Sequence, residues 1–153
     1  MIKTMNNYIV IGAVTALLAG CAGKPAGMVD EAELTAGGVT DTRHEPFDYW
    51  SVAKFVAPRF PDAAARDGVI GCVAMDLRIN TEGKVSGVYV TRSYPHGVFV
   101  DSAIAAVKKF QWAPSEANPG REPGVQSLSL DFNMVSSAST KNAAEYQREC
   151  AER

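Results

Sequence analysis

The sequence predicts a small α+β domain, in which an antiparallel three-stranded sheet packs with two helices in the order helix, strand, strand, helix, strand. Two kinds of pattern predict this fold. Three stretches have the two-residue period of strands with one buried face. Two others carry helix signals, since one is bounded by a proline and a glycine and the other has an apolar stripe. The chain has 153 residues, 46% hydrophobic and 21% charged, which suits one core with a leader and a tail.

The folded domain is expected to span residues 46–135. Its first part is too rich in aromatic residues for a disordered linker, because it contains Phe47, Tyr49, Trp50, Phe55 and Phe60. A short helix is expected over 61–67. Pro61 suits its first position, Asp62 its first turn and Gly68 a C-terminal cap.

A β-hairpin follows this helix. Its first strand has one apolar face and one polar face, formed by Val73, Met75, Leu77 and Ile79 and by Ala74, Asp76, Arg78 and Asn80, respectively. The turn NTEGK places Gly83 where a positive φ is expected, and residues 85–91 return as the second strand. Asp76 and Arg78 are expected to lie on an exposed polar face.

A second helix is predicted over 98–110, where an apolar stripe has helical spacing. The stripe contains Phe99, Ala103, Ala106, Val107 and Phe110. A loop over 114–124 leads into the last strand. There Leu128, Leu130, Phe132 and Met134 alternate with Ser127, Ser129, Asp131 and Asn133, which predicts a half-buried strand with a polar face.

The leader contains an apolar stretch, residues 8–19, that is shorter than the roughly 20 residues of a spanning helix. One basic residue, Lys3, precedes it, and small residues follow, as in a secretory signal. The sequence Leu18-Ala19-Gly20-Cys21 resembles the lipobox of bacterial lipoproteins, which implies cleavage after residue 20 and acylation of Cys21. Ala22 at the next position implies the outer membrane. The alternative is a signal peptide with a chance cysteine at its cleavage edge.

Residues 21–45 are rich in glycine, alanine and charge and show no sustained periodicity, so we expect a flexible tether. Removal of residues 1–20 deletes one lysine and no acid, which leaves 14 basic and 17 acidic side chains. This balance argues against nucleic acid as a partner, because phosphate binding requires a concentrated basic surface.

Two further cysteines, Cys72 and Cys150, would lie in an oxidising compartment after export, and we expect them to form a disulfide. Two separate buried thiols are the alternative. The tail, 136–153, has helical spacing after Ser139, but its apolar face is thin and needs Cys150 to dock it.

Several motifs follow one another at characteristic separations. They are Pro58-Arg59-Phe60-Pro61, Gly68-x-x-Gly71-x-Val73, Gly83-Lys84-Val85, Ser93, and Asp101-x-Ala103-x-x-Ala106-Val107-x-x-Phe110-x-Trp112-x-Pro114. Together they resemble the TonB C-terminal domain family over residues 58–135. Phe60 stands where the family more often has tyrosine, and Phe110 where tryptophan is common. The chain also has no membrane-spanning anchor or proline-rich rod before the domain, so the resemblance implies the binding domain without implying force transduction.

The resemblance implies a binding module that adds an extended peptide to the edge of its last strand, near the Pro-x-aromatic-Pro motif. By position, the partner-binding residues are Phe60, Pro61, Gln126, Ser127, Ser129, Asp131 and Asn133. The alternatives are that Phe60 anchors the core, that the edge is merely solvated, and that the tail covers it.

No constellation for catalysis, a metal or a cofactor is evident. Ser93, His96 and Asp101 are close in sequence, but a turn with Pro95 and Gly97 shows no sign of a nucleophile elbow. Gly68-x-x-Gly71 lies between a helix and a strand, where it indicates packing and turn chemistry and not a phosphate loop. We therefore expect no enzyme and no cofactor.

The expected function is binding of an envelope protein, such as a segment of a TonB-dependent receptor, by a lipid-anchored domain on the periplasmic face of the outer membrane. Two other functions stay open. One is a structural lipoprotein associated with peptidoglycan. The other is an energy transducer held in the inner membrane by an uncleaved leader.

Overall fold

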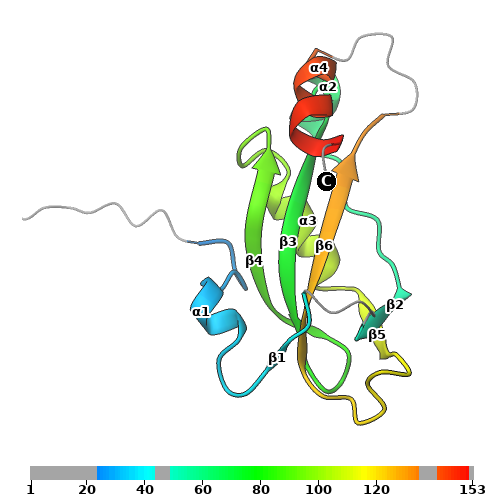
Figure 1. Cartoon of the computed structure of the whole chain (residues 1–153). Coiled ribbons are helices and arrows are strands. Elements are labelled where there is room, and N and C mark those ends of the chain that lie inside the picture. Colours follow the sequence, from blue (N-terminus) through cyan, green and yellow to red (C-terminus); the bar gives the residue numbers. More distant parts are fainter. Residues whose placement is uncertain (1–23, 44–48, 135–140, 152–153) are drawn as a thin grey trace, which may run out of the picture.

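The computed structural model describes residues 24–43, 49–134 and 141–151 (Figure 1). The strands are β1 (Thr40–Asp41), β2 (Trp50–Lys54), β3 (Gly71–Ile79), β4 (Val85–Tyr94), β5 (Gln111–Pro114) and β6 (Gly124–Phe132). The helices are α1 (Glu31–Leu34), α2 (Asp62–Asp67), α3 (Val100–Val107) and α4 (Ala143–Tyr146), and a π-helical turn, η1 (Gln147–Ala151), continues α4. Within these residues no helix is long and apolar enough to span a membrane. The leader and Cys21 lie outside the described residues.

The main sheet has four strands in the order β1-β6-β3-β4. Strand β3 pairs antiparallel with both β4 and β6, which confirms the three predicted strands. The prediction of a purely antiparallel three-stranded sheet was nevertheless wrong, because β1 adds a fourth strand parallel to β6. A second sheet, formed by β2 and β5, was also missed. Strands β1 and β5 have two and four residues, which is too short to produce a clear two-residue period.

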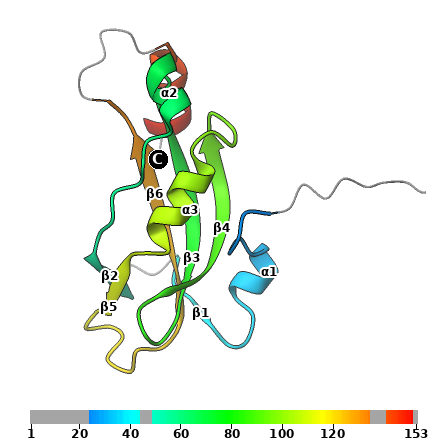
Figure 2. The same ribbon diagram turned by 180° about the vertical axis from the view of Figure 1, so that it is seen from behind.

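The core lies between the main sheet and α3, which crosses the back of the sheet (Figure 2). The predicted apolar face of β3 is buried, and so is the predicted stripe of α3 with its flanking residues, Phe99 and Phe110. The short helix α2 also forms as expected. Pro61 is its N-cap, and Gly68 ends it in the left-handed conformation with φ of 65°.

Residues 24–43, which we call the strap, lie on the opposite face of the sheet, which we call the outer face (Figure 1). Leu34 is fully buried and Val39 is 9% exposed, and both pack with Val125 of β6. The expectation of a flexible tether is therefore wrong for this segment. Its apolar residues show no periodicity because its elements are short, four residues in α1 and two in β1, and Val39 lies outside both.

The aromatic residues before α2 have different environments. Trp50 is 1% exposed, and its indole N–H donates to the carbonyl oxygen of Glu122 at 3.1 Å. Phe55 is 59% exposed, yet its ring lies 5.0 Å from that of Phe110. Phe47 lies outside the described residues. The aromatic segment therefore joins the folded domain through β2 and the contacts that follow it.

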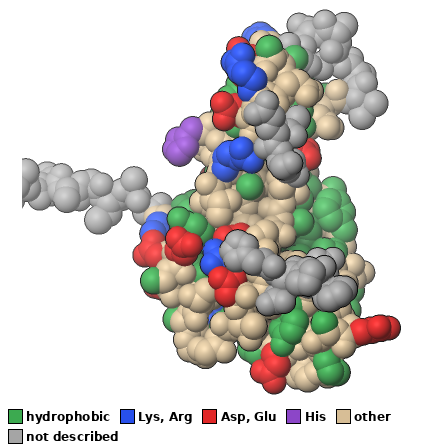
Figure 3. Space-filling model, viewed as in Figure 1, with side chains coloured by type: hydrophobic (Ala, Val, Ile, Leu, Met, Phe, Trp, Pro, Cys, Tyr) green, Lys and Arg blue, Asp and Glu red, His purple; other side chains and the backbone are tan. Residues whose placement is uncertain are grey.

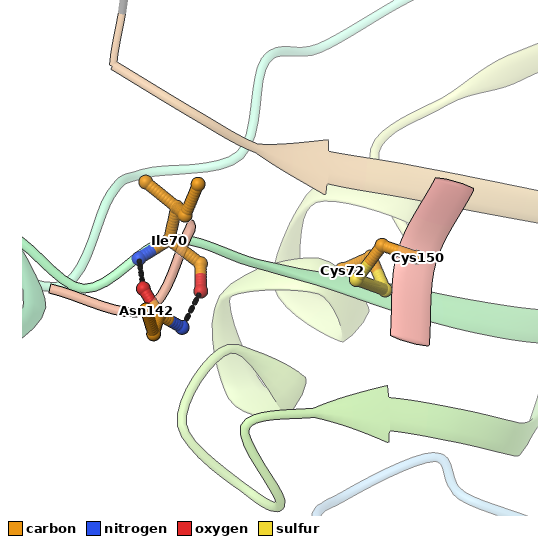
Figure 4. Close-up of a disulfide and its surroundings, with 4 residues drawn as sticks. All are labelled: Ile70, Cys72, Asn142 and Cys150. Atoms are coloured by element: carbon orange, nitrogen blue, oxygen red, sulfur yellow. Dashed lines mark hydrogen bonds between the residues drawn. A yellow bond between two sulfur atoms is a disulfide. The ribbon is translucent and has the colours of Figure 1, made fainter. Parts of the chain in front are cut away.

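The tail docks at the other end of the sheet from the strap (Figure 1). Cys150 forms a disulfide with Cys72 on the outer face, with 5.9 Å between the two Cα atoms (Figure 4). Asn142 adds a reciprocal pair of hydrogen bonds: its side-chain oxygen accepts from the Ile70 amide at 3.1 Å and its side-chain nitrogen donates to the Ile70 carbonyl at 2.8 Å. The predicted disulfide and the helical tail are both present in this structure.

Candidate partner-binding edge

The candidate site is the edge of β6 that faces away from β3. On one side, β6 pairs with β3 along its whole length, from Gly124 opposite Ile79 to Phe132 opposite Gly71. On the other side, the strap supplies partners for its first two residues alone, Gly124 and Val125. Among the described residues no strand lies beside the remainder of β6 (Figure 1). The described part of the tail docks on Ile70 and Cys72 and forms no strand at this edge.

Two hydrogen bonds with the strap show which backbone groups of β6 point away from β3. The carbonyl oxygens of Pro123 and Val125 both accept from strap residues, from the Thr40 amide and the Thr42 hydroxyl, respectively. The backbone N–H and C=O of one strand residue point to the same side, and successive residues alternate. The backbone groups of Ser127 and Ser129 therefore point to the strap side, while those of Leu128 and Leu130 point to β3.

The side chains of β6 divide between the two faces of the sheet. Ser127, Ser129 and Asp131 lie opposite Asp76, Ala74 and Cys72 of β3 on the outer face. The side chain of Gln126 lies on the other face, since its partner is Leu77. Asn133, which was expected in this strand, lies one residue beyond its end. The polar and apolar faces predicted for the last strand are thus present, but the strand ends at Phe132, before the predicted Asn133 and Met134.

Phe60 lies against the end of β6. Its ring centroid is 6.1 Å from that of Phe132 and 5.4 Å from that of Phe99, in edge-on arrangements. Phe60 and Pro61 are both half-buried. Phe60 therefore contacts the core, as one of the two readings of the sequence expected, and it does so next to the C-terminal end of the candidate edge.

A hollow of about 200 Å³ opens on the outer face beside this edge. Residues of β3, β4 and β6 line it: Ala74, Met75, Asp76, Thr91, Ser127, Leu128 and Ser129. Figure 3 shows this face, where basic and acidic side chains gather around the strap. The hollow therefore gives the outer face of the candidate edge a lining of both polar and apolar residues between the strap and the docked tail.

Asp76 is the main correction at this site. It was expected on an exposed face, but it is 6% exposed, because Arg43 of the strap covers it. One Asp76 carboxylate oxygen accepts from Arg43 at 2.8 Å and the other accepts from the Ser127 hydroxyl at 2.7 Å. Hydrogen bonds to Asp41 and then to Asp76 raise the pKa of Arg43 above its ordinary value, so the guanidinium stays charged. No local pattern around Asp76 signals a partner 33 residues earlier in the chain.

The residues considered for hydrolysis have other contacts. The Ser93 hydroxyl accepts a hydrogen bond from the Gly97 amide at 3.3 Å, which closes the turn after β4. His96 in the same turn is exposed. Among the described residues, no group of three or more His, Cys, Asp or Glu side chains is arranged to hold a metal ion. Ser93 thus has a role in the turn, and the hydrogen bonds give it no link to His96.

Known proteins resemble this chain over the part that contains β6. Residues 56–134 match the family described as Gram-negative bacterial TonB protein C-terminal. Protein tonB2 of Pseudomonas aeruginosa is 28% identical over 78 residues, which is 51% of this chain and 29% of tonB2. The match thus spans less than a third of that relative. The solution NMR structure of the Pseudomonas aeruginosa TonB CTD is similar with a TM-score of 0.50 and 15% identity, over 66% of this chain and 99% of that one.

Proposed function

Since the chain belongs to the Gram-negative bacterial TonB C-terminal family, we propose that it binds an extended segment of a cell-envelope protein along the edge of β6. A segment of a TonB-dependent receptor is the proposed partner, because binding such receptors is what the family implies. Family membership also indicates a binding module and not an enzyme.

The pairing of β6 is the observation that carries this proposal. A strand with a neighbour on one side offers backbone donors and acceptors to an extended peptide on the other side. Beyond Val125 the described residues supply no such neighbour, and Ser127 and Ser129 direct their backbone groups to that side. The added strand would meet polar side chains on the outer face and Leu128 and Phe132 on the other face.

The second part of the proposal is that Cys21 carries a lipid, which would hold the domain on the periplasmic face of the outer membrane. The lipobox-like sequence before Cys21 supports it. Because the strap is described from Lys24 onward, three Cα–Cα steps separate a lipid on Cys21 from the strap. Such a span reaches about 11 Å at most, so the domain would lie against the membrane surface and not on a long tether.

Strand addition is tested with a proline at an edge-facing position of β6. Ser129→Pro removes an amide that points away from β3, and proline is tolerated at such positions of edge strands. Ser129→Ala is the matched control, because it removes the hydroxyl and keeps the amide. We expect Ser129→Pro to weaken binding of a synthetic receptor amino-terminal segment at least about tenfold in calorimetry, and Ser129→Ala to bind as the wild type does.

Circular dichroism and urea unfolding of Ser129→Pro establish that its fold is intact. Equal binding by Ser129→Pro and wild type would reject the β6 edge as the site. Failure of the wild-type domain to bind any receptor segment or other envelope protein would reject the proposed function.

Lipidation is tested separately in cells. Cys21→Ala should abolish incorporation of a labelled fatty acid and should move the protein out of the outer-membrane fraction. A Cys21→Ala protein with unchanged processing and location would contradict lipidation and favour the uncleaved inner-membrane anchor.

A further inference from the structure

The strap contacts β4 and β6, the two strands that flank β3 in the main sheet. Near its start, the Val29 amide donates to the Val88 carbonyl oxygen of β4 at 2.9 Å, and the Val88 amide donates to the Gly27 carbonyl oxygen at 3.2 Å. Near its end, Thr40 and Asp41 pair with Gly124 and Val125 of β6. The strap therefore crosses the outer face from one edge to the other (Figure 1).

At β6 the strap makes the kind of contact that we propose for the partner. Strand β1 is an extended segment paired in register with an edge strand. It occupies the edge-facing backbone position of Val125, two residues before the corresponding position of Ser127. A partner strand that covered the whole edge would need the place that β1 holds.

Hydrogen bonds and side-chain packing, with no covalent cross-link among the described residues, hold β1 there: the Thr40 amide donates to the Pro123 carbonyl oxygen and the Thr42 hydroxyl to that of Val125. Leu34 and Val39 bury their side chains against Val125 and Tyr89, and Arg43 pairs with Asp76. The helix between the two edges, α1, has four residues, so it has little stability apart from these contacts. The tail, in contrast, is joined covalently to β3 through Cys72 and Cys150.

We propose that β1 is an internal occupant of the partner-binding edge, and that the partner segment displaces it to pair with Gly124 and Val125 as well as with the rest of β6. This inference rests on the proposed function. The binding site then spans all nine residues of β6. We call the strap closed while β1 pairs with β6 and open when it does not. A closed strap lowers the affinity for the partner segment, because only open molecules offer the whole edge.

Two substitutions weaken the strap through different contacts. Leu34→Ala removes its fully buried side chain, and Arg43→Gln removes the ion pair with Asp76. Arg148→Gln is the matched control, because Arg148 forms an exposed ion pair with Glu145 in the tail, outside both the strap and β6. While the strap stays mostly closed, the apparent Kd falls by about the same factor by which the substitution raises the open fraction.

The experiment combines affinity with amide hydrogen exchange in the full domain, and the probe is the synthetic receptor amino-terminal segment. We expect Leu34→Ala and Arg43→Gln to bind it about five- to tenfold more tightly than wild type, and Arg148→Gln to bind as wild type does. We also expect the Thr40 and Asp41 amides to exchange faster when the segment is bound, because displaced residues lose their pairing with β6.

Two results would overturn this inference and leave the proposed function standing. One is tight binding that neither strap substitution changes. The other is added protection of Thr40 and Asp41 on binding, which would mean that the segment pairs with β6 while β1 stays in place. If neither wild type nor any variant binds the segment, the proposed function fails and the inference fails with it.

Discussion

Reduction of the disulfide between Cys72 and Cys150 provides a quantitative test of how the tail stabilises the fold. The two cysteines are 78 residues apart in sequence. In the chain-entropy model, closing a loop of about that size raises the free energy of the unfolded chain by about 4.5 kcal/mol at 25 °C. The reduced protein should therefore unfold with a free energy lower by about that amount.

The structure also predicts which part of the protein reduction releases. Helix α4 has no buried residue, and Cys150 is 1% exposed because it lies against the sheet. Without the disulfide, the tail keeps the Asn142 hydrogen bonds to Ile70 and the bond from the Lys141 amide to the Gly68 carbonyl oxygen. The core between the main sheet and α3 has its own buried residues, so it should stay folded while the tail detaches.

Urea unfolding followed by circular dichroism, with and without reductant, measures this effect. With a slope of about 1.5 to 2 kcal/mol per molar urea, the midpoint should fall by about 2 to 3 M. Cys150→Ala is the control, because its midpoint should match that of the reduced protein and should not respond to reductant. A wild-type midpoint that changes by less than about 0.5 M would refute the reasoning, and so would complete unfolding on reduction without urea.

Two further predictions concern the core and the hairpin. Gly83 and Gly97 both have positive φ, but a Cβ at Gly83 would lie 2.0 Å from a carbonyl oxygen of Trp112, whereas nothing lies within 4 Å at Gly97. Gly83→Ala should therefore cost at least about 2 kcal/mol more than Gly97→Ala in urea unfolding, and equal costs would contradict this packing. Phe60→Ala should lower stability by about 2 kcal/mol, because the ring contacts two core phenylalanines, while Phe60→Tyr should stay within about 1 kcal/mol of wild type. An unchanged Tm of Phe60→Ala would show that the ring adds nothing to the core.

The elements that the sequence predicts correctly are those with strong local signals. The alternation from Val73 to Ile79 and the stripe around Ala103 report which face is buried, because each face repeats within its own element. Gly68 ends α2 with the positive φ expected of a C-terminal cap. The order of the five predicted elements, α2, β3, β4, α3 and β6, follows from these signals.

The elements that the sequence misses depend on distant partners. Thr40 and Asp41 form a strand because Gly124 and Val125 pair with them more than 80 residues later, and no local period reports such a partner. The alternation of its strand places Asp76 on a polar face, and Arg43, which covers it, lies 33 residues earlier in the chain. The alternation of β6 thus predicts the strand and its two faces, the choice of its edge rests on the resemblance to the TonB C-terminal domain family, and the strap at its start has no local signal.

The central claim is that an extended partner segment pairs with the edge of β6 that no described strand covers beyond Val125. Amide hydrogen exchange measured residue by residue, with and without the receptor segment, tests it most directly. The account predicts new protection of the Ser127 and Ser129 amides, which point away from β3, and little change at Leu128 and Leu130, which already face β3. Protection at another surface, with Ser127 and Ser129 unchanged, would contradict the account.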